Sequence, residues 1–391
     1  MKSNYKQLGQ FIRQVDVRNA SGKEENLLGV SVQKTFIPSI ANTVGTDFTK
    51  YKVVRRGQFT YIPDTSRRGD KIGIALLSDC DEGLVSNVYT TFEIIDKNEL
   101  LPEYLMLWFS RPEFDRYARF KSHGSVREVM DWDEMCKVQL PVPPISVQRD
   151  IVKAYQTITN RIALKQQVND NLVTSGIAAI SSVIGKAALI NATEADLLRL
   201  NLSENYSVKT VSEYCSETKS GSTPSRTVSD YWLNGTIPWV KSGEVHNNIT
   251  LQTEERITQS GLEGSSAKLL PIDTVLMAMY GVTAGEVGYL GVPATTNQAI
   301  CGMVCHSRSE AAYLYFALIQ SQSEISRLSN GGAQDNLSKN FIDGIKLIVP
   351  TSETLKEMRL PAFIDQMMLN TREIALLEDM QATLLAQLSS R

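Results

Sequence analysis

The sequence has no uncharged apolar run of 18 residues, and its first residues, MKSNYKQLGQ, lack the apolar stretch of a secretory signal peptide. Cysteine is scarce: the five cysteines, at positions 80, 136, 215, 301 and 305, are odd in number and scattered. Such a set argues against a disulfide framework and for a reducing compartment. We therefore expect a cytoplasmic protein that is not bound to a membrane.

Catalytic motifs are also missing. No GxxxxGK[ST] phosphate loop occurs, and the single Pro-Pro pair, Pro143-Pro144, is not the Asn/Asp-Pro-Pro-aromatic loop that holds the target amine of an amino-methyltransferase. Cys301, Cys305 and His306 lie on an apparent strand without a fourth metal ligand, so small buried side chains are the simpler interpretation. We expect no catalytic residue, no metal and no cofactor in this chain.

Charge is nearly balanced, with 40 basic and 43 acidic residues and a net charge of −3. The exception is residues 48–71, where seven basic side chains accompany only Asp64 and Asp70. A local excess of this kind is typical of a surface that binds a polyanion, because each cation set against a phosphate releases a condensed counterion. A solvated strand edge protected by its charges is the alternative interpretation.

Two long stretches, residues 146–186 and 351–391, repeat apolar side chains at helical spacing. Polar residues interrupt both stripes: Lys165 and Asn169 in the first, and Thr371, Glu378 and Gln381 in the second. Polar side chains at core positions of a coiled coil commonly fix its register, which predicts that each long helix packs along one partner helix. Packing of each helix on its own domain is the alternative.

The sequence before each long helix repeats. Residues 140–143 (LPVP) match residues 347–350 (LIVP) at an offset of 207 residues, and the loop 124–130 matches the loop 332–338. We therefore divide the chain into a globular domain at 1–145, a long helix at 146–186, a second globular domain at 187–350 and a second long helix at 351–391.

Each globular domain has a mixed pattern. Short β-branched runs with Gly and Pro between them predict strands, among them KVVRRGQFTYI, KIGIALL and LVSNVYTTFEI in the first domain and TIPWVKS, TVLMAMYG, EVGYLG and AICGMVC in the second. An amphipathic helix follows late in each domain, and a short helix is expected to open each one, at residues 8–15 and 208–215. Each domain is therefore predicted to be α+β.

Several loops carry residues suited to polar ligands. The loop 219–226 (KSGSTPSR) places glycine and small hydroxyl residues between two cations, and exposed N–H groups and hydroxyls of this kind suit phosphate oxygens. A plain surface turn is the alternative. The loops 124–130 and 332–339 contain arginine, glutamine and lysine, which can bond base edges, although helix caps use similar residue types.

In this order and in two copies, these strings resemble the specificity subunit of type I restriction-modification systems. The resemblance covers essentially the whole chain and rests on G-S-T-P-S-R followed by I-P-W-V-K-S-G-E, on T-N-Q-A-I, on G-V-S-V-Q-K-T-F-I-P-S at residues 29–39, and on the L-P-V-P-P junction. It implies an α+β fold of two pseudo-twofold-related target-recognition domains, separated by two long helices that form an antiparallel coiled coil.

The resemblance further implies a non-catalytic subunit that reads an asymmetric, bipartite site in double-stranded DNA. Two modification (methyltransferase) subunits and the restriction subunits would dock on it, so that S-adenosylmethionine and ATP bind those partners. The DNA contacts expected by residue type and place are Lys34, Lys50, Lys52, Arg55, Arg67, Arg68 and Arg127 in the first domain, and Lys219, Ser222, Thr223, Arg226, Lys241, Gln334 and Lys339 in the second.

Two other functions stay open at this point. An autonomous nuclease would use Asp64, Asp70 and Lys71, and a protein-interaction scaffold would recruit partners through its helices. One feature stands against a duplex reader acting alone: residues 187–350 hold eleven basic and sixteen acidic side chains. We therefore expect DNA binding by the isolated chain to be weak and strongly salt dependent.

Overall fold

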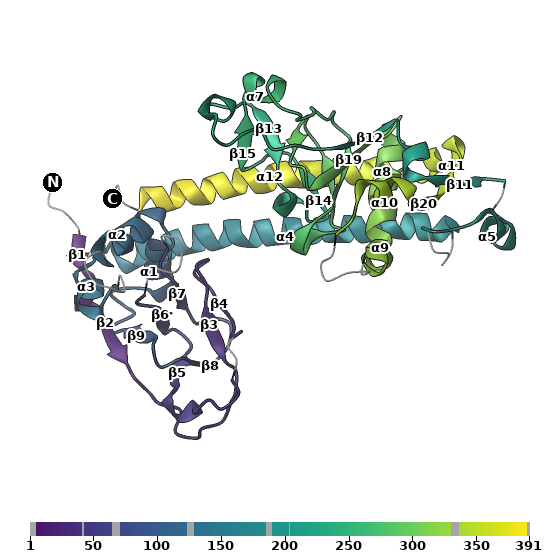
Figure 1. Ribbon diagram of the computed structural model, residues 1–391. Coiled ribbons are helices and arrows are strands. Elements are labelled where there is room, and N and C mark those ends of the chain that lie inside the picture. The colour runs from purple at the N-terminus through teal and green to yellow at the C-terminus, as the bar shows by residue number, and fades with distance from the viewer. Residues whose placement is uncertain are drawn as a thin grey trace. The chain divides into compact units, whose positions relative to one another are not determined.

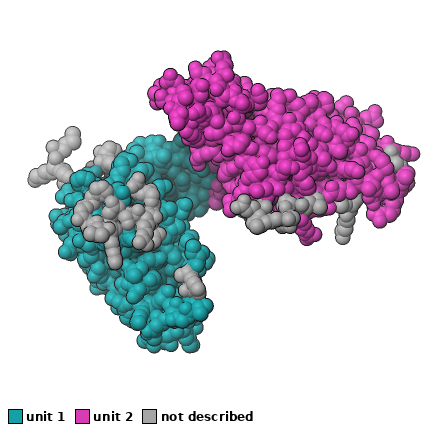
Figure 2. All heavy atoms as spheres, viewed as in Figure 1, with its two compact units in different colours: residues 1–162, 377–391 teal, residues 163–376 magenta. Residues whose placement is uncertain are grey.

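The computed structural model describes residues 5–40, 43–64, 71–122, 129–184, 190–202, 204–329 and 336–388. It contains two compact units: unit 1 comprises residues 1–162 and 377–391, and unit 2 comprises residues 163–376 (Figure 2). The division between units passes through the two long helices. Each unit therefore includes part of both helices in addition to its globular part.

Unit 1 is built around a four-stranded antiparallel sheet. Its order is β2 (Ile12–Val15), β9 (Thr90–Ile94), β6 (Phe59–Tyr61) and β7 (Ile74–Leu76). Two further antiparallel pairs are separate two-stranded sheets, β3 (Leu28–Val30) with β4 (Phe36–Pro38) and β5 (Lys52–Arg55) with β8 (Glu82–Val85). Helices α1 (Pro102–Phe109), α2 (Pro112–Ser122) and α3 (Trp132–Lys137) follow, and β10 (Gln139–Pro141) returns to pair with β1 (Tyr5–Gln7).

An aromatic cluster joins helix α1 to the sheet of unit 1. Phe59 and Phe92 stack across β6 and β9 with ring centroids 4.9 Å apart, and Phe109 of α1 meets both rings edge-on at 5.9 and 6.3 Å. All three side chains are fully buried. Aromatic pairs in these geometries add to the burial of apolar area, so this cluster fixes α1 on the sheet.

Unit 2 has a five-stranded sheet in the order β12 (Glu217–Ser220), β19 (Ile300–Val304), β16 (Val275–Ala278), β17 (Val287–Leu290) and β14 (Asn248–Thr250). Only the β17–β14 pair in this sheet is parallel. A second sheet has the order β15 (Glu255–Ile257), β13 (Ile237–Val240) and β18 (Thr295–Thr296), and β11 (Tyr206–Thr210) pairs with β20 (Lys346–Pro350).

The helices of unit 2 are α5 (Glu194–Arg199), α6 (Val211–Tyr214), α7 (Gln259–Glu263), α8 (Arg308–Gln320), α9 (Gln322–Ser329) and α10 (Lys339–Gly344). Helix α8 begins at a capping box between Ser307 and Glu310, and every residue from Ala311 to Leu318 is buried. A helix that is apolar on all sides must lie inside a core, and α8 forms the centre of the largest hydrophobic cluster in unit 2.

The two long helices are α4 (Ile145–Ile184) and α12 (Leu360–Gln387), the latter preceded by α11 (Ser352–Glu357) (Figure 1). In unit 2, Asn370 Nδ2 donates to Asn169 Oδ1 at 2.8 Å, and in unit 1, Gln381 Nε2 donates to Thr159 Oγ1 at 2.7 Å. Residue numbers rise along one helix as they fall along the other, so the helices are antiparallel. Three of the polar residues that interrupt the apolar stripes, Lys165, Asn169 and Gln381, therefore bond to the other helix, which confirms the predicted packing of one long helix on the other. Thr371 instead donates to the carbonyl of Met367 in its own helix.

The internal repeat extends to single hydrogen bonds. In unit 1 the hydroxyl of Tyr104 on α1 donates to the carbonyl of Pro141 on β10 at 3.0 Å. In unit 2 the hydroxyl of Tyr313 on α8 donates to the carbonyl of Ile348 on β20 at 2.5 Å. The same bond thus joins the late helix of each unit to the strand that leads into a long helix.

Most of the predicted strands are present, and one predicted helix is wrong. Residues 8–15 form a single 3-10 turn at Leu8–Gln10 followed by strand β2, because β2 pairs with β9 along its whole length. Residues 208–215 are also part strand, with only α6 helical. Among the helices of the described ranges, none combines the length and the apolar character needed to cross a membrane.

Candidate nucleic-acid interface

Loops from both sheets of unit 2 meet at one end of the five-stranded sheet. Because β12 and β16 are antiparallel to β19, the loops after β12 and β16 lie at the same end as the loop before β19. Ser222 N–H donates to the carbonyl of Thr296 at 2.9 Å, and Met279 N–H donates to the carbonyl of Ala299 at 2.7 Å. These main-chain bonds hold three loops as one continuous surface.

The loop after β13 joins the same surface. The hydroxyl of Thr283 donates to the carbonyl of Ser242 at 3.1 Å, which ties the turn after β16 to the turn after β13. Thr223 Oγ1 donates to Gln298 Oε1 at 2.5 Å, which links the loops after β12 and before β19 through their side chains. Hydroxyl and amide groups of this kind are able to bond phosphates or base edges.

Gly221 is required by this close packing. A Cβ at this position would lie 2.1 Å from the hydroxyl oxygen of Thr296 and 2.2 Å from the carbonyl oxygen of Asn297. Real Cβ atoms do not approach other atoms so closely, so only glycine lets the loop 221–226 run against the loop 296–299. The glycine of the G-S-T-P-S-R string therefore has a steric role.

Arg226 lies against two tryptophans. Its guanidinium carbon is 3.7 Å from the ring centroid of Trp232 and 5.1 Å from that of Trp239. Trp239 Nε1 in turn donates to the carbonyl of Ser222 at 3.0 Å. A guanidinium stacked on aromatic faces gains cation–π energy, so the loop is folded back onto the β13 sheet and held there by Arg226.

Every described lysine or arginine that we predicted as a contact in unit 2 is paired with a carboxylate. Arg226 makes two 2.7 Å hydrogen bonds to Glu255, which raise the pKa of Arg226 and lower that of Glu255. The other pairs are Lys241 with Glu254, Lys219 with Glu217 at 2.6 Å, and Lys339 with Asp343 at 2.5 Å. The excess of acidic residues in this part of the chain therefore neutralises these four cations locally.

In unit 1 the predicted contacts differ in accessibility. Lys34 is almost buried, with its Nζ 2.5 Å from Asp115 Oδ1, and burial lowers the pKa of its ammonium group. Its side chain is therefore poorly placed for the DNA contact that the sequence predicted. Lys52 donates to the carbonyl of Tyr89 at 2.7 Å. The remaining described cations are exposed: Lys50 lies 3.5 Å from Asp47 and Arg55 lies 3.6 Å from Glu82. Arg67, Arg68, Arg127 and Gln334 lie outside the described residues.

Three residues of the loop surface were not predicted as contacts. Gln298 lies in the T-N-Q-A-I string, and its bond to Thr223 places it in the surface. Tyr280 is partly exposed and Val282 fully exposed, on the turn after β16. Gly281 and Gly285 have φ values of +81° and +85°, which shows that the turn is tight. The available signal was the pair of glycines, Gly281 and Gly285, directly after the apolar run of β16. Among the described residues there is no cluster of three or more His, Cys, Asp or Glu that could hold a metal ion.

Comparison of the sequence with known proteins shows which domain family and which relatives it resembles. Residues 203–378 match the type I restriction modification DNA specificity domain. The chain is 27% identical over 135 residues to the EcoR124I/EcoR124II specificity subunit of Escherichia coli, a match that spans 33% of each chain. It is 20% identical over 370 residues to the HindI specificity subunit of Haemophilus influenzae, spanning 78% of this chain and 79% of that one.

A solved structure shares the fold. The type I restriction-modification S subunit from M. genitalium aligns over 98% of this chain and 95% of its own, with a TM-score of 0.53 at 14% identity. Residues 203–378 thus match a DNA specificity domain. Over most of its length the chain is similar to specificity subunits of type I restriction-modification systems. Asp70, one of the residues of the nuclease alternative, lies outside the described residues.

Proposed function

We propose that the protein reads a bipartite DNA site, one half with each target-recognition domain, residues 1–145 and residues 187–350. Residues 146–186 and 351–391 then act as the spacer. The repeated framework supports this proposal: the Tyr104 and Tyr313 hydroxyl bonds and the β1–β10 and β11–β20 pairs recur in both halves of the chain. Dimeric DNA readers use two copies of a module for two half-sites, and an internal repeat does the same within one chain.

The two half-sites are expected to differ. The loops that follow the shared framework have unlike sequences, and the second domain carries the Arg226 and tryptophan stack described above. Base readout depends on individual side chains in such loops, so unlike loops read unlike bases. The full target is therefore asymmetric.

Partners supply the chemistry in this proposal. Two modification subunits would methylate adenine with S-adenosylmethionine, and restriction subunits would cleave DNA with ATP, within a cytoplasmic complex. The carboxylate pairs of Lys219, Arg226, Lys241 and Lys339 support a need for partners, because these four charges are not free to grip phosphates. We therefore expect tight binding only when the modification subunits are present.

Mapping of methylated adenines in the source genome tests the proposal. The expected result is a single motif with two unlike specified parts, a fixed unspecified gap between them, and a methylated adenine in each part. In a second arm, residues 187–350 are exchanged for those of a relative. This exchange should change one part of the motif and leave the other intact; a motif with one continuous part, or a change in both parts, would contradict the proposal.

A further inference from the structure

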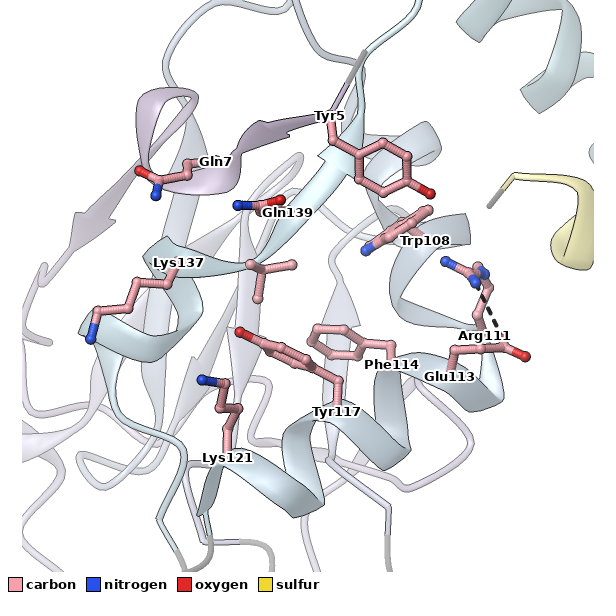
Figure 3. A pocket seen from close by; sticks show the side chains of 11 residues that line it. Tyr5, Gln7, Trp108, Arg111, Glu113, Phe114, Tyr117, Lys121, Lys137 and Gln139 are labelled. Atoms are coloured by element: carbon pink, nitrogen blue, oxygen red, sulfur yellow. Dashed lines mark ion pairs between the residues drawn. The ribbon is translucent and has the colours of Figure 1, made fainter. Parts of the chain in front are cut away.

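Unit 1 contains a cavity of about 670 Å³ between the α1–α2 corner and the β1–β10 pair (Figure 3). This volume is within the range of ligand pockets in proteins. One wall is aromatic and a second is basic, and one carboxylate, Glu113, lies at the edge. The aromatic wall is formed by Tyr5, Trp108, Phe114 and Tyr117, and the basic groups are Arg111, Lys121 and Lys137.

The basic groups are held in place by their surroundings. The Arg111 guanidinium lies over the Trp108 ring, 4.0 Å from its centroid, and only 4% of the residue is exposed. Lys121 and Lys137 both approach Glu134, at 3.5 and 2.7 Å. Arg111 in turn lies 3.4 Å from Glu113, so the three cations are matched by two carboxylates, Glu113 and Glu134, and exceed them by one. With its apolar walls, the cavity therefore complements a ligand that carries an acidic group and an apolar or aromatic group.

The internal repeat identifies the corresponding place in unit 2. Leu8 N–H donates to the carbonyl of Val138 at 2.8 Å, and Val211 N–H donates to the carbonyl of Ile345 at 2.9 Å. The β1–β10 pair therefore corresponds to the β11–β20 pair, and α3 corresponds to α10. Lys137, the last residue of α3, then corresponds to Gly344, the last residue of α10.

In unit 2 an extended segment of the chain itself covers this place. Ile190 forms an antiparallel bridge with Leu347, and Asn191 N–H donates to the carbonyl of Lys346 at 2.7 Å, so the segment adds to the edge of β20. Glu194 Oε1 accepts from the N–H of Val208 on β11 at 3.2 Å. The side chain of Ile190 is 1% exposed, and the segment continues into the short helix α5.

We propose that the unit 1 cavity binds an extended acidic segment of a second polypeptide, which adds to the edge of β10 as residues 190–191 add to β20. One apolar or aromatic side chain of that segment enters between Trp108 and Tyr117, and its carboxylates face Lys121 and Lys137. The acidic preference follows from the excess of one cation in the unit 1 cavity. One of these cations, Lys137, has no charged counterpart in unit 2, where Gly344 occupies its position. Strand addition with side-chain pockets is a common mode of peptide recognition.

A nucleic-acid strand fits the cavity less well. Helix α2 begins at the cavity with Pro112, which has no N–H to donate, and carries Glu113 and Asp115 in its first turn. Both features disfavour phosphate at a helix N-terminus. The inference concerns a surface other than the loop surface of unit 2, so its failure would leave the proposed DNA reading unaffected.

Peptide binding to the full-length protein tests the inference. The probe is a ten-residue peptide with the sequence of residues 190–199, INATEADLLR, labelled with a fluorophore and a photo-reactive benzophenone. A second peptide carries Glu194→Lys and Asp196→Lys. The protein variants are Lys121→Gln with Lys137→Gln in the cavity, and Lys153→Gln as a control at an exposed lysine of the same unit outside the cavity.

The first peptide is expected to bind and to crosslink within residues 5–7 or 137–141. The double cavity variant should weaken its binding about fivefold to tenfold, since two charge contacts are lost, and the control variant should leave it unchanged. The charge-inverted peptide should bind at least as weakly as the double variant does. Absence of binding, equal binding of both peptides, crosslinks within residues 206–210 or 346–350, or displacement by a single-stranded oligonucleotide would each overturn the inference.

Discussion

Replacing Glu255 with glutamine should strengthen DNA binding by releasing Arg226. In the protein, Glu255 holds the guanidinium through two 2.7 Å hydrogen bonds, and half of the Arg226 side chain is exposed to solvent. Glutamine keeps the size of the side chain and removes its charge. The stack on Trp232 and Trp239 remains, so Arg226 stays in place and its charge becomes available to a phosphate.

The size of the effect follows from counterion release. One added phosphate contact steepens the dependence of log K on log salt by about 0.9, which corresponds to binding about fivefold tighter at 0.15 M salt for an otherwise unchanged interface. The matched control is Glu263→Gln, which changes the net charge of the same unit equally at an exposed residue that bonds Gln259 and frees no cation.

Fluorescence anisotropy of a labelled duplex, titrated with each protein over a series of salt concentrations, measures both quantities. We expect a steeper slope and tighter binding for Glu255→Gln and a nearly unchanged slope for Glu263→Gln. Equal slopes for the two variants would refute the reasoning, because net charge alone would then explain any gain. Weaker binding by Glu255→Gln would show that the ion pair itself belongs to the interface.

Three further substitutions test the framework. Asn370→Leu leaves the amide of Asn169 without its buried partner, so urea unfolding should show a loss of about 1–3 kcal/mol, and an unchanged midpoint would contradict the role of this pair. Gly221→Ala places a Cβ 2.1 Å from the hydroxyl oxygen of Thr296, so the loop must shift and both the DNA affinity and the melting temperature should fall; unchanged affinity of the folded variant would remove the loop 221–226 from the interface. Tyr313→Phe removes the hydroxyl bond to strand β20, which should cost about 0.5–1.5 kcal/mol by the same unfolding assay, and no loss would show that water replaces the bond.

The long-range plan of the fold was accessible from sequence because it repeats. The LPVP and LIVP strings lie in equivalent places of the two copies, and polar residues such as Asn169 and Gln381 indicated that each long helix packs along another helix. Strands such as β16 and β19 were also predictable, since their apolar runs are short and bounded by turn residues. The same reasoning predicted a helix at residues 8–15, which is wrong. The conformation of these residues is decided by the pairing of β2 with β9, a strand some 80 residues later in the chain.

The electrostatics of the candidate interface could not be predicted in the same way. Arg226 and Glu255 are 29 residues apart, and only the folding of the loop onto strand β15 brings them together. Lys34 resembled a surface cation in the sequence, but its partner Asp115 is 81 residues away on α2. Charge patterning along a chain identifies where cations occur, whereas their availability depends on contacts between distant segments.

The sharing of both long helices between the units affects how the chain is completed during synthesis. Leu388 is 3% exposed in the core of unit 1, next to residues from the first 140 positions. These N-terminal residues leave the ribosome early, yet the last turns that close their core are translated only after all of unit 2. Domains commonly fold in the order of synthesis. Here the unit that begins first must finish last, so a nascent chain stalled before position 377 would carry a complete second unit and an open first one.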